Sequence, residues 1–406
     1  MLHEFLENFL HNLFKPLLLF FYFGFLISIL KVDFEFPAAI YQGLTMYLLV
    51  SIGWHGGEEL AKIKASSIGH LLGFMVTGLV LNFLIGLVAY FLLSRLTSLR
   101  RVDKATVAGY YGSDSAGTFA TCVAVLTSAG IAFNAYMPVM LAIMEVPGCL
   151  VALYLVARLR DKGMDARGYM PDEAGYAAPA RVGPGTATQP AQGHALDEFE
   201  PGIEHVGELA LREREHRGPR GDASAGKPGI FSRQLMREVF LNPGLCLLFG
   251  GIVIGFVSGL QGPKVVHDGD VLFVHAFQGA LCLFLLEMGM TAARKLRDLR
   301  SAGGGFIFFG LLAPNIFAIL GIFVAYSYAY VTNTAFSPGT YVLFAVLCGA
   351  ASYIAVPAVQ RLAIPEASPT LPLAASLGLT FSYNVTIGIP LYIEIARMVG
   401  HLFPIA

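Results

Sequence analysis

The stretch GYYGSDSAGTFATC, from Gly109 to Cys122, places glycine, serine and an acid in the middle of an otherwise apolar run. A second stretch, LCGAASYIAVPAVQR from Leu347 to Arg361, again places glycine and serine in an apolar run late in the chain, with Pro357 and without an acid. Glycine permits non-helical backbone, and proline removes a backbone donor and clashes with the preceding turn. Each stretch therefore predicts a helix that is broken part-way along.

The composition of the 406 residues is that of a membrane protein. Hydrophobic residues make up 55% of the chain and charged residues 14%, against roughly 25% charged residues in soluble domains. A compact soluble protein cannot hide so much apolar surface from water. The composition excludes a disordered chain, a collagen and an ordinary globular enzyme, and the net charge of −1 gives no basic footprint for nucleic acid.

Ten apolar ranges are predicted as membrane spans, because about 20 helical residues cross the hydrocarbon core. The five that precede a polar stretch are residues 13–30, 37–54, 67–94, 105–127 and 133–157. The five that follow it are residues 239–259, 271–291, 303–329, 340–359 and 369–396. The predicted fold class is an all-α polytopic membrane protein of about ten transmembrane helices.

Four parts of the chain follow from this pattern. Residues 1–12 carry leucine and phenylalanine at helical spacing with acids between them, which predicts a short interfacial helix. A first five-helix membrane repeat is predicted over 13–160 and a second over 233–406. Residues 161–232 are rich in glycine, proline and mixed charge and predict a flexible linker.

The two membrane halves match one another at several positions. The matched residues are Gly24 and Gly251, Gly53 and Gly289, Gly112 and Gly349, and Ser115 and Ser352. Their offsets of 227, 236 and 237 residues are similar and keep their order, which predicts an internal repeat. Because each repeat has an odd number of spans, the second enters the membrane from the opposite side, and the two repeats are inverted.

The loop charges predict an orientation. Ten lysine and arginine residues fall in the short loops on one side of the predicted spans, and three fall on the other side. Since positive charge gathers in cytoplasmic loops, both termini are predicted outside a cell membrane and the linker in the cytoplasm.

Two broken helices at matching depth predict a solute site near the middle of the membrane. Freed N–H groups and positive helix ends attract a small anion, whereas carboxylates and freed carbonyls hold a cation. Asp114 is predicted as a cation ligand or proton carrier, because a charged acid at this depth costs about 2.5–3.5 kcal/mol. The alternative is a neutral Asp114 that hydrogen-bonds to a neighbouring helix. Glu145 and Asn384 are predicted as further oxygen ligands, and a structural acceptor is an equal alternative for Glu145.

Five motifs in order resemble the sodium-dependent bicarbonate transporter family best known from cyanobacteria. They are IGWHGGEELAK (52–62), VDKATVAGYYGSDSAGTF (102–119), MEVPGCLVAL (144–153), LEMGMTAARKLRDLR (286–300) and CGAASYIAVPAVQRLAIP (348–365). The similarity covers both membrane halves and thins out in the linker.

The resemblance implies ten helices in two inverted repeats with crossed broken helices, divided into a gate and a moving core. It implies a homotrimer that takes up bicarbonate with Na+ by an elevator-like motion, and a PII-like regulatory protein docking on the cytoplasmic face. Carried over by position, the family's site selects Ser113, Ser115, Thr118, Glu145, Ala351, Ser352 and Tyr353. The chain departs from the family pattern at Asp114, where that pattern is apolar, and at Ala350 and Ala351, where it is richer in serine.

The predicted function is therefore sodium-dependent bicarbonate symport, with no enzyme chemistry and no cofactor beyond the coupling ion. Anion-binding candidates are Gly112, Ser113, Ser115, Gly117, Thr118, Gly349, Ser352 and Tyr353. Cation-binding candidates, grouped as a Na+ site around the acid, are Asp114, Ser115, Glu145, Ser352 and Asn384. Replacement of sodium by a proton at Asp114 is one alternative. The others are symport of another small organic anion and a transport-inactive membrane sensor or scaffold that presents its linker to a soluble partner.

Overall fold

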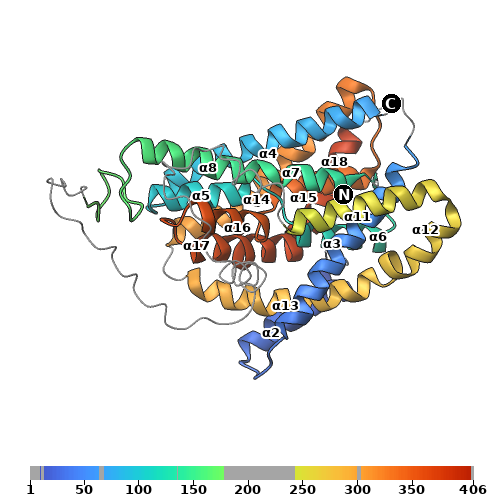
Figure 1. The fold of residues 1–406 in the computed structure, drawn as a ribbon, viewed down its shortest axis with the longest axis horizontal. Coiled ribbons are helices and arrows are strands. Elements are labelled where there is room, and N and C mark those ends of the chain that lie inside the picture. The colour runs from blue at the N-terminus through green and yellow to red at the C-terminus, as the bar shows by residue number, and fades with distance from the viewer. Residues whose placement is uncertain are drawn as a thin grey trace, which may run out of the picture.

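The structure is a computed structural model, and it describes residues 10, 13–63, 68–134, 136–177, 243–299 and 303–403. Within these ranges all regular secondary structure is helical (Figure 1). The predicted interfacial helix over 1–12, apart from Leu10, and the linker residues 178–232 lie outside the described part of the chain.

The helices of the first half are α2 (Pro16–Ile29), α3 (Ala38–Leu60), α4 (Ile68–Leu96), α5 (Arg101–Tyr111), α6 (Ala116–Ser128), α7 (Met137–Met144) and α8 (Val146–Asp161). Those of the second half are α11 (Pro243–Gln261), α12 (Pro263–Asp270), η2 (Val271–His275), α13 (Phe277–Asp298), α14 (Gly304–Thr332), α15 (Pro338–Gly349), α16 (Ala355–Ala363), α17 (Thr370–Leu373), η4 (Ala374–Phe381), η5 (Asn384–Gly388) and α18 (Ile389–Leu402). The elements labelled η are short stretches of wider π-helix.

Six helical segments of the described residues are long and apolar enough to cross a membrane. They are Ile68–Leu96, Met137–Asp161, Pro243–Gln261, Pro263–Arg297, Gly304–Thr332 and Thr370–Leu402. These spans confirm the prediction of an all-helical, multi-pass membrane protein. Each of the other predicted ranges also contains helix, although these helices are shorter, interrupted or less apolar. The number of ten crossings stays a prediction.

Two groups of helices make up the bundle. Helices α2, α3, α11 and α13 pack mainly on one another, and we call them the scaffold group. Helices α4 to α8 and α14 to α18 form the core group, in which α5 packs on α4 and α8 and α15 packs on α14 and α18. Figure 1 shows the two groups as separate regions of the ribbon, with α2 lying along α13 and α3 beside α11.

Glycines allow the scaffold helices to approach closely. A Cβ atom added to Gly24 would lie 1.9 Å from the Leu286 carbonyl oxygen on α13, and one added to Gly289 would lie 2.1 Å from the Phe21 carbonyl oxygen on α2. The other pair of scaffold helices repeats this arrangement. A Cβ atom on Gly53 of α3 would lie 2.9 Å from the Cα atom of Gly251 on α11. These backbone contacts require the absence of a side chain.

The first part of the predicted flexible linker is ordered. After α8 ends at Asp161, residues 164–177 form a set of turns that we call the clasp. The Asp165 carboxylate accepts hydrogen bonds from the backbone N–H groups of Arg167, Tyr169 and Ala177 at 2.8–2.9 Å. These bonds hold the turns together, and the buried Met170 joins them to the hydrophobic core of the protein. Composition alone does not reveal such contacts.

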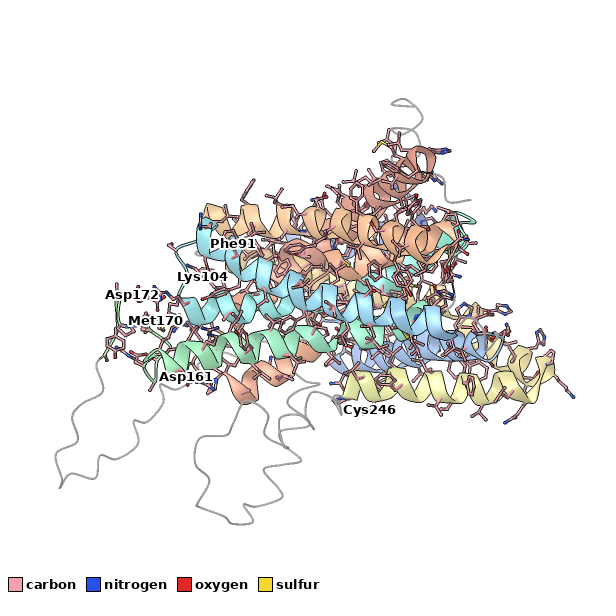
Figure 2. The ribbon with its side chains drawn as sticks, turned by 90° about the horizontal axis from the view of Figure 1, so that it is seen from above. Phe91, Lys104, Asp161, Met170, Asp172 and Cys246 are labelled. Atoms are coloured by element: carbon pink, nitrogen blue, oxygen red, sulfur yellow. The ribbon has the colours of Figure 1, made fainter. Side chains whose placement is uncertain are left out.

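The clasp is attached to the beginning of α5. The Glu173 carboxylate accepts a hydrogen bond from the backbone N–H of Arg101 at 2.8 Å, where the first turn of α5 has a free donor. The Arg100 guanidinium donates to the Arg167 carbonyl at 2.7 Å, and Arg101 forms an ion pair with Asp172. Figure 2 shows Met170 and Asp172 of the clasp close to Lys104 of α5.

Candidate functional site

The first break separates α5 from α6. Helix α5 ends at Tyr111 and α6 begins at Ala116, so residues 112–115 cross the core group as non-helical backbone. The Ser115 hydroxyl caps α6, because it accepts hydrogen bonds from the Thr118 backbone N–H at 3.3 Å and from the Thr118 hydroxyl at 2.9 Å. As at any helix start, the first N–H groups of α6 have no partner within the helix.

Close packing against α4 and α8 fixes the position of this break. A Cβ atom on Gly112 would lie 3.0 Å from the Cα atom of Gly86 and 3.2 Å from the Asn82 carbonyl oxygen. The Ser113 hydroxyl donates to the Glu145 carbonyl oxygen at 2.8 Å. That carbonyl belongs to the junction of α7 and α8, where Pro147 lacks a backbone donor.

The second break separates α15 from α16. Helix α15 ends at Gly349 and α16 begins at Ala355. The Ser352 hydroxyl accepts a hydrogen bond from the Val356 backbone N–H at 3.5 Å, so the matched residues Ser115 and Ser352 each face the first turn of the second half-helix. The Asn384 side-chain amide donates to the Gly349 carbonyl at 2.9 Å and satisfies one acceptor that the break frees.

The two breaks meet in the interior of the protein. The Ser352 backbone N–H donates to the Tyr110 carbonyl oxygen at 2.8 Å, which joins the end of α5 to the second break. The Tyr353 side chain crosses to the other broken helix, and a Cβ atom on Gly117 would lie 1.9 Å from its hydroxyl oxygen. We call the region formed by residues 112–118 and 349–353 the crossing.

Asp114 is the most exceptional group at the crossing. Its side chain is fully buried, and neither carboxylate oxygen has a hydrogen-bond partner among the described residues. It interacts electrostatically with Glu145 and with the Cys348 thiol, which places it between the junction of α7 and α8 and the end of α15. A buried carboxylate without a partner carries a large desolvation cost, so this position favours a cation or a proton.

Other polar groups at or beside the crossing also lack partners. The Asn82 side-chain oxygen is buried and has no hydrogen-bond partner in the described part of the chain. The buried Tyr353 hydroxyl lies beside Ser115 and the Gly117 backbone, at distances or angles outside normal hydrogen-bond geometry. Among the described residues, no cluster of three or more histidine, cysteine, aspartate or glutamate side chains is arranged to hold a metal ion. The oxygen atoms present suit a monovalent hard cation better than a transition metal, which prefers nitrogen and sulfur ligands.

A comparison with protein families identifies the chain. Residues 16–397 match the model of the Na+-dependent bicarbonate transporter superfamily, which covers nearly all of the sequence. The chain belongs to this superfamily. The resemblance inferred from the five motifs is thereby confirmed. Membership in a transporter superfamily also agrees with the prediction that the protein is a membrane transporter and not an enzyme. A comparison with curated proteins finds no match.

The structure brings most of the predicted residues of this superfamily member together. The anion-binding candidates all lie in or directly beside the two breaks: Gly112, Ser113, Ser115, Gly117, Thr118, Gly349, Ser352 and Tyr353. Of the cation-binding candidates, Asp114 lies within the first break and Glu145 is its electrostatic neighbour. The Asn384 side-chain amide donates to the Gly349 carbonyl at the second break. Its side-chain oxygen accepts a hydrogen bond from the Tyr392 hydroxyl at 2.9 Å.

Two polar residues near the crossing were missed by the sequence analysis. Asn82 lies in the apolar helix α4 and donates from its side-chain amide to the Met144 carbonyl at 2.9 Å. Thr380 of η4 contacts the Tyr111 hydroxyl at 2.6 Å. Asn82 could have been identified from the sequence, because a side-chain amide in the middle of a long apolar helix indicates a polar contact. Thr380 could not, because threonine is common in such helices and can bond to its own backbone.

Proposed function

We propose that this protein carries bicarbonate into the cell together with sodium ions, through ten membrane crossings arranged as two inverted repeats. Membership in the Na+-dependent bicarbonate transporter superfamily supports the substrate and the coupling ion. The observation that carries the proposal is the meeting of two broken helices beside Asp114, a buried carboxylate whose oxygens have no partner among the described residues.

The charges at the crossing couple the binding of bicarbonate to the binding of sodium. The first turns of α6 and α16 direct partial positive charge and free N–H groups toward the crossing, which favours an anion. The carboxylate of Asp114 opposes that anion as long as it is charged and unpaired. A sodium ion on Asp114 removes this opposition, and so anion and cation binding favour one another. Thr118 and Tyr353 supply hydroxyl groups for the anion.

The two helix groups provide the parts for alternating access. The core group contains the crossing, and the scaffold group contacts it mainly where α13 packs on η4. We propose that the core group moves as a body against the scaffold group and carries the crossing from one side of the membrane to the other. The proposal retains the predicted orientation, with both termini outside and the linker in the cytoplasm, and a trimeric assembly.

Uptake into proteoliposomes tests the proposal. We expect labelled bicarbonate to accumulate with an inward sodium gradient and not after choline replaces sodium outside. Asp114→Asn keeps the shape of the side chain but removes its charge, so we expect accumulation to be lost. Asp172→Asn on the exposed clasp is the matched control and should transport normally, since an exposed ion pair contributes little. Sodium-driven accumulation by the Asp114→Asn variant would overturn the assignment of the coupling ion to this carboxylate.

A further inference from the structure

A basic pocket lies at the end of the scaffold group, away from the crossing. It has a volume of about 420 Å³ and is formed by the C-terminal ends of α2 and α13 and the loop that follows α2. Of the described residues that line it, the basic ones are Lys31, Arg294, Lys295 and Arg297, and Asp33 is the one acidic residue. Positive charge in membrane loops is common, but here four cations face one concave space.

The arginines of this pocket are held in place. The Arg297 guanidinium donates to the Ser28 carbonyl at 3.0 Å, which ties the end of α13 to the last turn of α2. The Arg294 guanidinium donates to the Glu287 carboxylate and the Thr291 hydroxyl at 3.0 and 3.1 Å. Because these groups are already oriented, an anion that enters the pocket loses little affinity to side-chain ordering.

Lys31 occupies a backbone position that favours glycine. Its φ of 54° lies in the left-handed region, and it follows the end of α2 in a Schellman arrangement, with the Val32 N–H bonded to the Ile27 carbonyl and the Lys31 N–H bonded to the Ser28 carbonyl. A lysine in this conformation is strained where glycine is not. What the lysine supplies, and glycine cannot, is a positive charge at the rim of the pocket.

Apolar surface continues from the same place. Val32 and Phe34 of the loop line the pocket and are about half exposed, at 53% and 46%. Phe23 and Leu26 of α2 and Leu30, the residue that follows this helix, are also exposed at helical spacing and lead toward the pocket. A ligand that satisfies both features carries an anionic head and an apolar tail.

We propose that this pocket binds the phosphate headgroup of an anionic phospholipid, with an acyl chain along the exposed face of α2. Oriented guanidinium groups suit a phosphate, and lysine adds charge without a fixed geometry. The bound lipid would join the ends of α2 and α13 and stabilise the scaffold group against which the core group packs. A free phosphate ion shares the head chemistry but leaves the apolar surface uncovered.

Lipid titration of the purified full-length protein tests this proposal. Phosphatidylglycerol is added to the protein in phosphatidylcholine nanodiscs, and thermal unfolding is followed. We expect phosphatidylglycerol to raise the midpoint, and inorganic phosphate at the same concentration to leave it unchanged. In Lys31→Gly we expect about fivefold weaker apparent affinity for phosphatidylglycerol, the loss typical of one basic residue at an anionic surface. Without that lipid this variant should unfold at the same or a higher temperature, because the strain is gone.

Asn333→Gly is the matched control. Asn333 is the other non-glycine residue with positive φ in the described part of the chain, at 50°, and it ends α14 in the same way. This variant should keep the full response to phosphatidylglycerol. Lys295→Gln removes a second charge without touching the turn and should weaken the response as Lys31→Gly does. An undiminished response in both lysine variants, or equal stabilisation by inorganic phosphate, overturns the proposal.

Discussion

The buried carboxylate of Asp114 has a thermodynamic consequence. Because its oxygens have no hydrogen-bond partner among the described residues, its charge is uncompensated until a cation binds. We expect sodium chloride to raise the unfolding temperature of the purified protein relative to choline chloride, by an amount equivalent to about 2.7 kcal/mol at a hundredfold excess over the dissociation constant.

Asp114→Asn should show no such sodium response and should be at least as stable as the wild-type protein in choline chloride. A sodium-dependent shift of equal size in both proteins would place the ion elsewhere. The comparison is independent of uptake, and therefore separates ion binding at Asp114 from the movement that follows it.

Gly117 and Tyr353 are in close contact across the two broken helices. Gly117→Ala would place a Cβ atom where the Tyr353 hydroxyl lies, and we expect a loss of about 1–3 kcal/mol of stability together with reduced uptake. Gly250→Ala is the control, since nothing lies within 4 Å of a Cβ atom there. Adding Tyr353→Phe to Gly117→Ala removes the clashing oxygen and should recover part of the unfolding free energy. If Gly117→Ala unfolds like Gly250→Ala, the contact does not constrain the crossing.

At the scale of elements, the clasp gives a pH dependence. Hydrogen bonds from the Ala177, Tyr169 and Arg167 N–H groups lower the pKa of Asp165 below its ordinary value of 3.8. A carboxyl group whose pKa is lowered by folding stabilises the clasp above that ordinary value, and this contribution is lost as the pH falls through the lower pKa of the folded state. The protection of the amides of residues 164–177, measured as their exchange rate relative to the intrinsic rate at each pH, should therefore be unchanged between about pH 7 and 5 and weaker below about pH 4.

The matched variants locate this effect. Asp165→Ala should expose the same amides at neutral pH, whereas Asp172→Asn should leave their exchange unchanged because Asp172 only forms an exposed ion pair. Rapid exchange of these amides in the wild-type protein at neutral pH would contradict the ordered clasp.

The two breaks and the clasp show which elements a sequence reveals. Glycine, serine and proline in mid-span predicted both breaks, because their effect on a helix is local. The clasp was not predicted, since its order depends on Arg100 and Arg101, which precede it by more than sixty residues. Likewise, the role of Asn384 in holding the Gly349 carbonyl depends on a contact between distant segments. A sequence predicts where backbone groups are freed but not which group from elsewhere satisfies them.

At the scale of the molecule, the matched glycines pack in exchanged pairs. Gly24 and Gly289 lie at the contact of α2 with α13, and their matched residues, Gly251 and Gly53, lie at the contact of α11 with α3. The first helix of each predicted repeat thus packs on the second helix of the other. A twofold axis between inverted repeats would produce this exchange. Contacts within each repeat also match, because Gly112 approaches Asn82 of α4 and Gly349 approaches Ala318 of α14.

Movement of the core group against the scaffold group can be tested at their contact. Lys15, just before α2, donates from its ammonium group to the Ser128 hydroxyl at 2.8 Å and to the Val125 carbonyl at 3.2 Å at the end of α6. Ser128 and the native Cys282 of α13 line the same pocket, of about 650 Å³. A Ser128→Cys variant, with the exposed Cys246 replaced by serine, therefore carries one reactive thiol on each helix group.

A bifunctional methanethiosulfonate reagent should join these thiols and stop sodium-driven uptake, and a reductant should restore it. The same reagent on the variant with Cys282→Ser in addition can attach at only one end and should leave most of the uptake intact. If the cross-linked protein transports as fast as the reduced one, the two helix groups do not move past each other during transport. Access would then have to alternate through smaller changes within the crossing itself, where Asp114 and the free ends of α6 and α16 lie.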